Sequence, residues 1–286
     1  MKKKGRIYMS NRKIGIPSFD MTGKNVIVTG GSQGLGFGIA AAFCAYGANV
    51  VITARTVSKV QDAERDLNEN YCKGGRCIGI PADSSKAADV AMVIAKTVEA
   101  FGELNIFVNN AGISGKTAKI LTDACDEANF QKVIDINLKG MFLFDKAAAA
   151  QMVKQNATNG KKGGKIINIA SVGGLIGGPG VVAYGASKAG AISLTKTFAN
   201  ELGRENITVT AVCPGYVVTP LNEDVFVDPA TGGWTKIYEL SAKNTALRRL
   251  GTIEEIAAPV LAMASDGFGY MTGTYLLVDG GQTIGR

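Results

Sequence analysis

The sequence predicts an α/β fold, in which a doubly wound parallel sheet of about seven strands carries helices on both faces. Two observations predict it. Strand and helix patterns alternate along the chain, and the strands are short apolar runs, as expected for strands covered on both faces. The 286 residues are 46% hydrophobic, which suffices for the large core of one α/β unit.

The expected elements follow one another in the order that this fold requires. Strands are expected at residues 26–29, 49–53, 76–80, 104–108, 165–169, 208–212 and 275–278. Helices are expected at residues 34–46, 57–70, 86–101, 123–135, 138–155, 183–202 and 253–265. Crossovers between parallel strands are right-handed, and ligands of such sheets bind beyond the carboxyl ends of the strands. Polar and glycine residues at these ends are therefore the first candidates for a site.

A glycine-rich loop follows the first strand and leads directly into the first helix. Residues 29–36 read Thr-Gly-Gly-Ser-Gln-Gly-Leu-Gly, which places Gly30, Gly34 and Gly36 in a TGxxxGxG pattern. Glycines permit a tight turn and a close backbone approach to an anion, and the helix N-terminus offers free N–H groups to a pyrophosphate. The loop therefore predicts a dinucleotide site, with a merely flexible loop as the alternative.

The end of the second strand bears on the choice of dinucleotide. An Asp or Glu there would hold both ribose hydroxyls of NAD, but the chain has Arg55 and no acid. A guanidinium can clamp a 2′-phosphate, so NADP is favoured and NAD remains possible. An ordinary surface arginine is the alternative, because the glycine loop carries Gln33 where a second basic residue would strengthen the case.

Two further strand ends carry candidates for cofactor contacts. Asp83 follows the third strand and can accept a hydrogen bond from an adenine amino group, or serve as the N-cap of the helix at 86–101. Asn110, Ala111 and Gly112 follow the fourth strand, where small residues and a side-chain amide suit close packing along a cofactor. An asparagine-rich turn is the plain alternative.

The chemistry centres on Tyr184 and Lys188, which share one helix face because they are four residues apart. The pKa of an unperturbed tyrosine is near 10, and a neighbouring ammonium lowers it. We expect Lys188, together with the positive nicotinamide ring, to lower the pKa of Tyr184, so that the phenol passes a proton to or from a substrate oxygen while the nicotinamide carries the hydride. Ser171, at the end of the fifth strand, can hold the same oxygen, with an ordinary turn serine as the alternative.

Composition excludes several other classes of function. The chain has no histidine, which removes Ser-His-Asp and Cys-His nucleophilic schemes and His-ligated metal sites, and no metal is expected. The five scattered cysteines indicate a reduced, cytoplasmic protein. No apolar run is long enough to predict a membrane span.

The positive charge is concentrated at the N-terminus. Of the formal charge of +7, six basic residues before Asp20 contribute +6, which leaves 7 − 6 = +1 for the remainder. Residues 1–19 are therefore interpreted as a basic N-terminal arm, solvated or in contact with an anionic surface, and residues 20–286 as a single domain. A nearly neutral body argues against a nucleic-acid-binding face.

Five motifs together resemble the short-chain dehydrogenase/reductase family. They are the glycine loop, residues 109–112, Ser171, the Tyr184 and Lys188 pair, and Pro214-Gly215, in order between about residues 20 and 282. The resemblance implies a Rossmann-like domain that binds NAD(P) and interconverts a ketone and a secondary alcohol. It also implies a homotetramer, assembled through the helices at 138–155 and 183–202.

The resemblance also implies individual roles. It makes Asn137 the fourth member of a catalytic tetrad with Ser171, Tyr184 and Lys188, holding a water that relays protons through Lys188, which also binds the nicotinamide ribose. The other implied cofactor contacts are Ser32, Gln33 and Leu35 at the phosphates, Asp83 and Ser84 at the adenine, Asn110, Ala111 and Gly112 along the adenosine, and Val217 and Thr219, after Pro214 and Gly215, at the carboxamide and phosphate.

The least regular stretch, residues 215–250, is expected to form a substrate lid, because long loops in compact domains are often lids. Its aromatic residues either line an apolar pocket or close the lid on its own core, and Arg248 or Arg249 can meet a carboxylate. The C-terminal tail resembles the sugar-acid and polyol branch of the family, such as gluconate 5-dehydrogenases, while the apolar lid favours a steroid ketone, as in bacterial hydroxysteroid dehydrogenases. A dinucleotide-binding regulator without catalysis is the third hypothesis.

Overall fold

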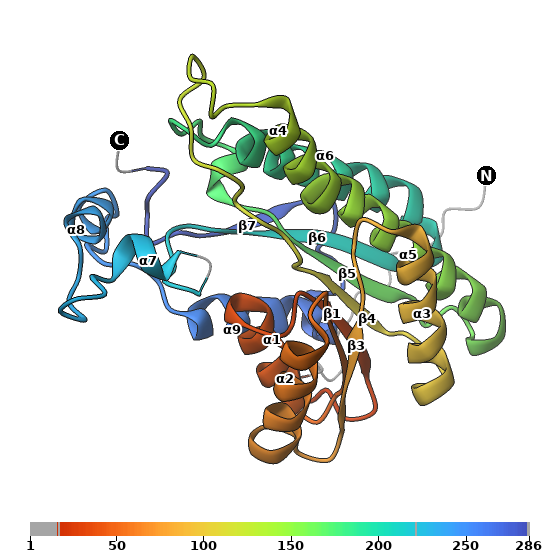
Figure 1. The fold of residues 1–286 in the computed structure, drawn as a ribbon. Coiled ribbons are helices and arrows are strands. Elements are labelled where there is room, and N and C mark those ends of the chain that lie inside the picture. The colour runs from red at the N-terminus through yellow and green to blue at the C-terminus, as the bar shows by residue number, and fades with distance from the viewer. Residues whose placement is uncertain (1–15, 17, 221, 285–286) are drawn as a thin grey trace, which may run out of the picture.

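A computed structural model describes residue 16 and residues 18–220 and 222–284. Seven parallel strands form one sheet in the order β3-β2-β1-β4-β5-β6-β7 (Figure 1). The strands are β1 Asn25–Thr29, β2 Asn49–Ala54, β3 Cys77–Pro81, β4 Ile106–Asn109, β5 Gly164–Ile169, β6 Ile207–Pro214 and β7 Tyr275–Val278. The predicted fold class is confirmed. The basic arm lies almost entirely outside the described residues.

Helices cover both faces of the sheet, as Figure 1 shows. On one face lie α1 Gly34–Ala45, α2 Val57–Asn70 and α9 Ile253–Ala264, and on the other lie α3 Ala87–Phe101, α4 Glu127–Ile134, α5 Gly140–Asn159 and α6 Val182–Leu202. None of the described helices is both long and apolar enough to cross a bilayer.

The apolar run Val26-Ile27-Val28 of the central strand β1 is buried on both faces of the sheet. All five of its residues are buried, and its neighbours are β2, with Val26 opposite Val50, and β4, with Val26 opposite Ile106. Val26 and Val28 belong to the core packed against α1 and α9, whereas Ile27 belongs to the core on the side of α3 and α5. Successive side chains of a strand point to opposite faces, so a strand covered on both sides must be apolar throughout.

The order of the strands reverses between β1 and β4. The chain runs from β1 outward to β3 and then returns to β4 on the other side of β1. In sheets of this kind, the loops at this reversal separate and leave a crevice beyond the carboxyl ends of the strands. The glycine loop after β1 and residues 110–112 after β4 both lie at this crevice.

Two expected boundaries differ from the structure for identifiable reasons. The helix expected at 123–135 begins at Glu127, because the Asp126 carboxylate caps it by accepting a hydrogen bond from Asn129 N at 2.6 Å. The strand expected at 104–108 begins at Ile106, because Leu104 exchanges both backbone hydrogen bonds with the Gln155 side chain of α5, at 3.1 and 2.6 Å.

The helices expected at 123–135 and 138–155 are joined rather than separate. A π-helical turn, Asp135–Lys139, connects α4 to α5 without a break. Such turns insert an extra residue into a helix and are frequent at functional sites. Here the turn carries Asn137.

The 215–250 segment was expected to be irregular, yet it contains two short helices, α7 Glu223–Phe226 and α8 Lys236–Lys243. In Figure 1 they extend beyond one end of the sheet. Phe226, Ala242 and Leu250 form a small core of their own, with Tyr216 and Tyr238 packed against it. Helices of four and eight residues carry too little periodicity to be recognised from sequence alone.

Candidate active site

A cavity of about 730 Å³ opens at the carboxyl ends of the strands. Its lining includes nearly every residue that the sequence singled out. These are Gly30, Ser32, Gln33, Gly34, Leu35, Gly36, Arg55, Asp83, Ser84, Asn110, Ala111, Gly112, Ser171, Tyr184, Lys188, Pro214, Gly215, Val217 and Thr219. The exceptions are Asn137, which is buried behind the wall, and the two arginines Arg248 and Arg249.

The glycine loop is packed too closely for side chains. A Cβ added at Gly36 would lie 2.2 Å from Gly30 O and 2.5 Å from Asn110 Nδ2, and Gly30 itself has a φ of +66°. The helix that follows begins after Gln33, whose side chain makes no capping hydrogen bond to it. The first N–H groups of α1 therefore remain available to an anion in the cavity.

Thr29 and Asn110 fasten the two strands at the reversal point. The Thr29 hydroxyl oxygen accepts hydrogen bonds from the backbone N–H groups of Asn110 and Ala111, at 2.9 and 3.0 Å. In return, Asn110 Nδ2 donates to Thr29 O at 2.9 Å. Because these bonds hold the ends of β1 and β4 together, the floor of the crevice is set before any ligand binds. Sequence analysis placed Thr29 in the loop motif but did not foresee this tie.

Arg55 is not the only cation at its end of the cavity. Lys59, in the first turn of α2, also lines the wall, as does Gln33 from the glycine loop. Arg55 and Lys59 are four residues apart across the start of the helix. This four-residue spacing was a usable signal for a second cation beside Arg55, and the sequence analysis did not identify Lys59.

Asp83 lines the cavity but does not cap the helix that follows it. The N-cap of α3 is Lys86, which lacks a side-chain cap, so that expectation was wrong. The Asp83 carboxylate instead accepts hydrogen bonds from Ser85 N and Ser85 Oγ, at 3.0 and 2.7 Å. Burial alone would raise the pKa of Asp83, but these bonds and the charges of Lys86 and Arg55 hold it below its ordinary value.

Ser171, Tyr184 and Lys188 converge beside Gly173. Lys188 Nζ lies 5.7 Å from the centroid of the Tyr184 ring and donates to Ile169 O at 2.7 Å. A Cβ at Gly173 would be 3.4 Å from both Ser171 Oγ and Tyr184 Cε1. Ser171 Oγ accepts a hydrogen bond from Gly173 N at 3.0 Å, which leaves its own proton to donate.

Burial shifts the pKa values of both titratable groups away from their charged forms. It lowers the pKa of Lys188 to about 8, and it raises the pKa of Tyr184 above its ordinary value despite an opposing contact with Ser171. The expected lowering of the Tyr184 pKa is thus wrong for the protein by itself, because the desolvation of the phenolate outweighs the effect of its neighbours. Tyr184 is protonated at neutral pH.

Asn137 is buried, and both ends of its side-chain amide are in use. Its Oδ1 accepts from Ile113 N and its Nδ2 donates to Ile113 O, both at 2.8 Å, and Nδ2 also contacts Ser187 Oγ at 3.1 Å. The amide therefore holds the chain after Gly112 against α6. A Cβ at Gly112 would be 3.3 Å from Asn137 Oδ1 and 3.8 Å from Lys188 Nζ, so the two side chains approach the same glycine.

A fully buried carboxyl group lies beneath the catalytic strand ends. Asp145 of α5 accepts hydrogen bonds from Asn109 Nδ2 at 2.9 Å and Asn168 Nδ2 at 3.0 Å. No salt bridge to it occurs within the described residues, and burial raises its pKa to about 7. These bonds join β4, α5 and β5. Sequence analysis did not identify Asp145, because its partners are distant in the chain.

Comparisons with known proteins agree with this geometry. Residues 29–283 match a family model described as "Enoyl-(Acyl carrier protein) reductase". The chain is 37% identical to an L-rhamnose-1-dehydrogenase of Scheffersomyces stipitis, over 92% of this chain and 97% of that protein. It is 36% identical to a 3beta-hydroxysteroid dehydrogenase 1 of Eggerthella lenta, over 93% and 95% of the two chains.

Among solved structures, a short-chain type dehydrogenase/reductase from Mycobacterium marinum superimposes with a TM-score of 0.83, at 33% identity, over 93% of this chain and 98% of that one. This chain belongs to the short-chain dehydrogenase/reductase family. It is accordingly an oxidoreductase acting on alcohol or ketone groups, and enzymes of this family use NAD(P).

The cavity fits the family's dinucleotide on grounds that the structure itself supplies. At Gly30 and Gly36 the backbone packs so closely against its neighbours that there is no room for a side chain. The N-terminus of the following helix α1 has no side-chain cap. Two cations, Arg55 and Lys59, lie at the rim. Residues of the 215–250 segment also line the cavity, and Thr219 and Pro220 lie beside the glycine loop, each 3.5 Å from a Cβ placed at Gly34.

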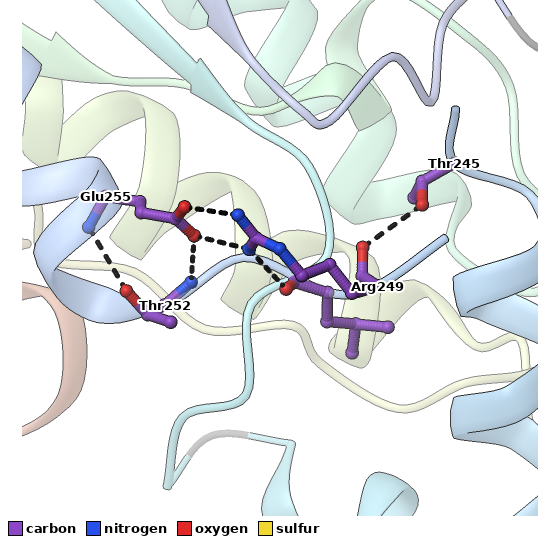
Figure 2. A network of polar contacts seen from close by, with 5 residues as sticks. Thr245, Arg249, Thr252 and Glu255 are labelled. Carbon is purple, nitrogen blue, oxygen red and sulfur yellow. Dashed lines mark hydrogen bonds and ion pairs between the residues drawn. The ribbon is translucent and has the colours of Figure 1, made fainter. Parts of the chain in front are cut away.

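Figure 2 shows how this segment is fastened to the rest of the short-chain dehydrogenase fold. The Arg249 guanidinium makes a two-pronged ion pair with Glu255 of α9, at 2.7 and 2.6 Å, and Glu255 also accepts from Thr252 N at 3.0 Å. The Thr245 hydroxyl donates to Arg249 O at 3.1 Å. The hydrogen bonds from Arg249 and Thr252 lower the pKa of Glu255 to about 2, so the pair persists across the neutral range.

The aromatic residues of the segment divide between the two expected roles. Tyr216 and Phe226 line the cavity, whereas Trp234 stacks on Tyr238 at a centroid distance of 4.0 Å and remains 56% exposed. Arg249 is committed to Glu255, and Arg248 donates to Lys243 O; neither lines the cavity.

Proposed function

We propose that this short-chain dehydrogenase interconverts a neutral, bulky and largely apolar ketone with its secondary alcohol, using NADP(H) in preference to NAD(H). The observation that carries the substrate class is the composition of the cavity wall outside the glycine loop and the strand ends. Its apolar members are Ile113, Ile136, Val172, Ile176, Pro179, Val181, Val225 and Phe226. Among the described residues, the cationic side chains of the whole lining are Arg55, Lys59 and Lys188.

This wall favours the hydroxysteroid-type hypothesis over the sugar-acid hypothesis that the C-terminal tail suggested. A carboxylate buried without a cation or several hydrogen-bond donors pays a large desolvation cost. Arg248 and Arg249, the candidates for binding a substrate carboxylate, do not line the cavity. The relative named as a 3beta-hydroxysteroid dehydrogenase supports the same direction, whereas the L-rhamnose-1-dehydrogenase keeps a neutral polyol as the second candidate.

The residues around the cavity are assigned as follows in this proposal. The glycine loop and the N-terminus of α1 hold the pyrophosphate, Arg55 and Lys59 hold the 2′-phosphate, and Asp83 with Ser84 meets the adenine. Asn110, Ala111 and Gly112 pack along the adenosine, and Pro214, Gly215, Val217 and Thr219 bound the nicotinamide end. When bound there, the nicotinamide supplies or accepts the hydride.

In this proposal the chain's own side chains handle the proton. The Ser171 hydroxyl donates to the substrate oxygen and fixes its position, and the Tyr184 hydroxyl gives its proton to that oxygen as the ketone becomes an alcohol. Because burial raises the pKa of Tyr184, the protein holds this tyrosine in its acidic form, which suits ketone reduction. Lys188 binds the nicotinamide ribose and takes part in the proton relay. Asn137 supports this region through its hydrogen bonds to the backbone of Ile113.

The proposal is tested by NADPH and NADH oxidation with a panel of ketones, followed by the absorbance of the reduced nicotinamide. Matched pairs with and without a carboxylate separate the two substrate classes. We expect turnover of neutral polycyclic or branched ketones and at least tenfold lower kcat/KM for the carboxylated partner, since 1.4 kcal/mol is a factor of ten. Equal or better turnover of the carboxylated ketones contradicts the substrate class, and no turnover of any ketone favours a non-catalytic regulator.

We also propose a homotetramer assembled through α5 and α6, as the family resemblance implies. Phe142 and Val153 of α5 are 39% and 37% exposed, which is consistent with a helix face that meets another subunit. Light scattering at micromolar concentration tests this: a tetramer mass is expected, and a monomer mass contradicts it.

A further inference from the structure

Among the cavity-lining residues to which no role has been given above, one polar side chain combines deep burial with an unused donor. Gln282 follows β7, is 3% exposed and lines the cavity. By contrast, the amide of Asn222, another residue of the cavity lining, is already hydrogen-bonded to neighbouring backbone. It accepts from Thr219 N at 2.8 Å and donates to Val217 O at 2.9 Å. Thr117 is exposed.

The orientation of the Gln282 amide is determined by its partner. Tyr216 N, a backbone donor, lies 3.2 Å from Oε1 of Gln282. A backbone N–H can be met only by the oxygen of the amide, so the amide nitrogen must point the other way. A Cβ at Gly215 would lie 2.9 Å from the same oxygen, which shows how closely the amide packs against the turn after β6.

The turn that carries Gln282 is itself held in place. The Asp279 carboxylate accepts from Gly281 N at 3.0 Å and from Thr283 N and Thr283 Oγ1, both at 2.8 Å. Gln282 N donates to Asp279 O at 3.0 Å. The side chain therefore starts from a well-defined backbone, and its direction does not depend on a ligand.

Nε2 of Gln282 has no hydrogen-bond partner among residues 16, 18–220 and 222–284. It is also absent from the three side-chain atoms of this part of the chain that are both unpartnered and fully enclosed, namely Asn159 Nδ2, Lys165 Nζ and Asn168 Oδ1. Because Gln282 lines the cavity, we assign this nitrogen to the cavity.

We propose that Gln282 is a specificity-determining residue whose amide N–H donates to a second oxygen of the substrate, remote from the reacting carbonyl. The inference rests on the function proposed above and narrows it. The substrate is an apolar ketone that carries a further carbonyl, hydroxyl or ether oxygen. Tyr184 and Ser171 hold the reacting oxygen from the β5 and α6 side, and Gln282 meets the second oxygen from the β6 and β7 side.

The physical reason is the asymmetry of hydrogen bonding in a water-poor site. A substrate without the second oxygen leaves the buried donor unpaired, and a site built around such a donor rejects that substrate strongly. A substrate that has the oxygen gains the bond and loses nothing elsewhere, because Oε1 stays with Tyr216 N.

The test uses two probes of one skeleton, a decalin monoketone and the corresponding decalin diketone, with NADPH. Gln282→Glu retains an oxygen for Tyr216 N but replaces the donor with an acceptor, and Gln282→Met removes both polar atoms at similar length. Thr117→Val, at the exposed mouth of the same cavity, is the matched control. Cofactor affinity is followed separately through NADPH fluorescence.

We expect the wild type to prefer the diketone by tenfold or more in kcat/KM, mainly through KM. Both Gln282 variants lose this preference while they retain monoketone kcat and NADPH affinity within about twofold, and Thr117→Val retains the preference. The proposal is overturned if the wild type turns over both probes equally, or if the Gln282 variants lose both substrates in parallel, as a purely structural role would require. Absence of ketone turnover by the wild type is a different result, which removes the proposed function itself.

Discussion

The cavity has two walls that are built in different ways. The sheet wall consists of the strand ends, the glycine loop and α6, and its residues are tied by hydrogen bonds between side chains and backbone across the reversal point, such as those between Thr29 and Asn110. The segment wall consists of residues 215–250, whose short helices enclose a small core around Phe226 and Leu250. The ion pair of Arg249 with Glu255 fastens its base.

The difference indicates where function and specificity can vary independently. On the sheet wall, the position of an atom follows from the close approach of two backbones, and a single added carbon at Gly36 would collide at 2.2 Å. On the segment wall, few contacts bind the tip to the sheet, and Trp234 remains half exposed. We therefore expect changes on the sheet wall to abolish chemistry or cofactor binding, and changes on the segment wall to adjust substrate affinity.

The largest effect expected on the sheet wall is that of Tyr184→Phe. It removes the proton that the substrate oxygen receives, and general acid–base groups contribute about 10² to 10⁴ in rate. We expect kcat to fall by that amount while the Kd of NADPH, measured by fluorescence titration, changes less than threefold. Retention of more than half of the wild-type kcat contradicts the role of Tyr184.

Lys188→Met tests whether the buried amine of the sheet wall lowers the free energy of unfolding. Burial lowers the pKa of Lys188 from 10.5 to about 8, so between these values the unfolded chain binds more protons and stability rises with pH. Removing the amine should therefore raise the free energy of unfolding at pH 7 by roughly 3 kcal/mol, since each pKa unit between 10.5 and about 8 is worth about 1.4 kcal/mol.

The gain should shrink as the pH rises from about 8 to 10.5, because the wild-type lysine, already neutral in the folded protein, then loses its proton in the unfolded chain as well. Denaturant unfolding at pH 7, 9 and 10.5 measures it. A gain that does not depend on pH would show that packing, and not the charge, makes the difference. Turnover should be lost at every pH.

Gly36→Ala tests the close approach directly. The added Cβ meets Gly30 O at 2.2 Å and Asn110 Nδ2 at 2.5 Å, so the loop must shift. Overpacking of this kind costs about 1–3 kcal/mol, and the displaced loop should bind NADPH at least tenfold more weakly. Thermal unfolding and fluorescence titration provide the two readouts.

The matched control for this prediction is Gly203→Ala. A Cβ at Gly203 meets no atom within 4 Å, and its φ is −56°. We expect its stability and cofactor affinity to match those of the wild type. If Gly36→Ala also keeps the stability and NADPH affinity of the wild type, the glycine loop can shift to accept a side chain. That result contradicts the rigid packing described for the sheet wall.

Arg55→Ala and Lys59→Ala probe the rim of the sheet wall. Each should raise the KM for NADPH while leaving that for NADH nearly unchanged, because only NADPH carries the 2′-phosphate. A charge-assisted hydrogen bond to an exposed site is worth about one to two kcal/mol, so the wild-type preference should be roughly tenfold rather than absolute. A wild type that prefers NADH would show that these cations do not clamp a phosphate.

The smallest effect is expected at the base of the segment wall. Arg249→Met breaks the two-pronged pair with Glu255 and leaves α9 capped by Thr252. Both partners are largely solvated, so we expect a small change in melting temperature, a two- to fivefold rise in the ketone KM and no change in NADPH affinity. Steady-state kinetics with both substrates varied measure this. A loss of cofactor affinity would mean that the two walls are not independent.

The sequence predicted the sheet wall well because its signals are local. Alternating apolar runs specify strands, and glycines between a strand and a helix specify an anion-binding turn, so Gly30, Gly36, Arg55 and Asp83 were located before the structure was known. Family resemblance suggested Asn137 as a fourth candidate catalytic residue, and only the structure shows that its amide is hydrogen-bonded to the backbone of Ile113.

Other features depended on residues far apart in the chain and gave no local signal. Asp145 lies on a helix that looks ordinary in sequence, yet it meets Asn109 and Asn168 beneath the strand ends. In the protein without cofactor, burial raises the pKa of Tyr184, and this burial is a property of the folded site that the spacing to Lys188 does not reveal.

By itself, then, the sequence determined the fold, the crevice at the reversal point and the candidate proton donor, because helix and strand periodicity, glycine conformations and the spacing of Tyr184 and Lys188 act over a few residues. The tertiary structure decided which groups line the cavity. It brought Gln282 to Tyr216, 66 residues away, and directed Arg249 to Glu255 and away from the cavity. Such pairings depend on how distant elements pack, and no local pattern in the chain encodes them.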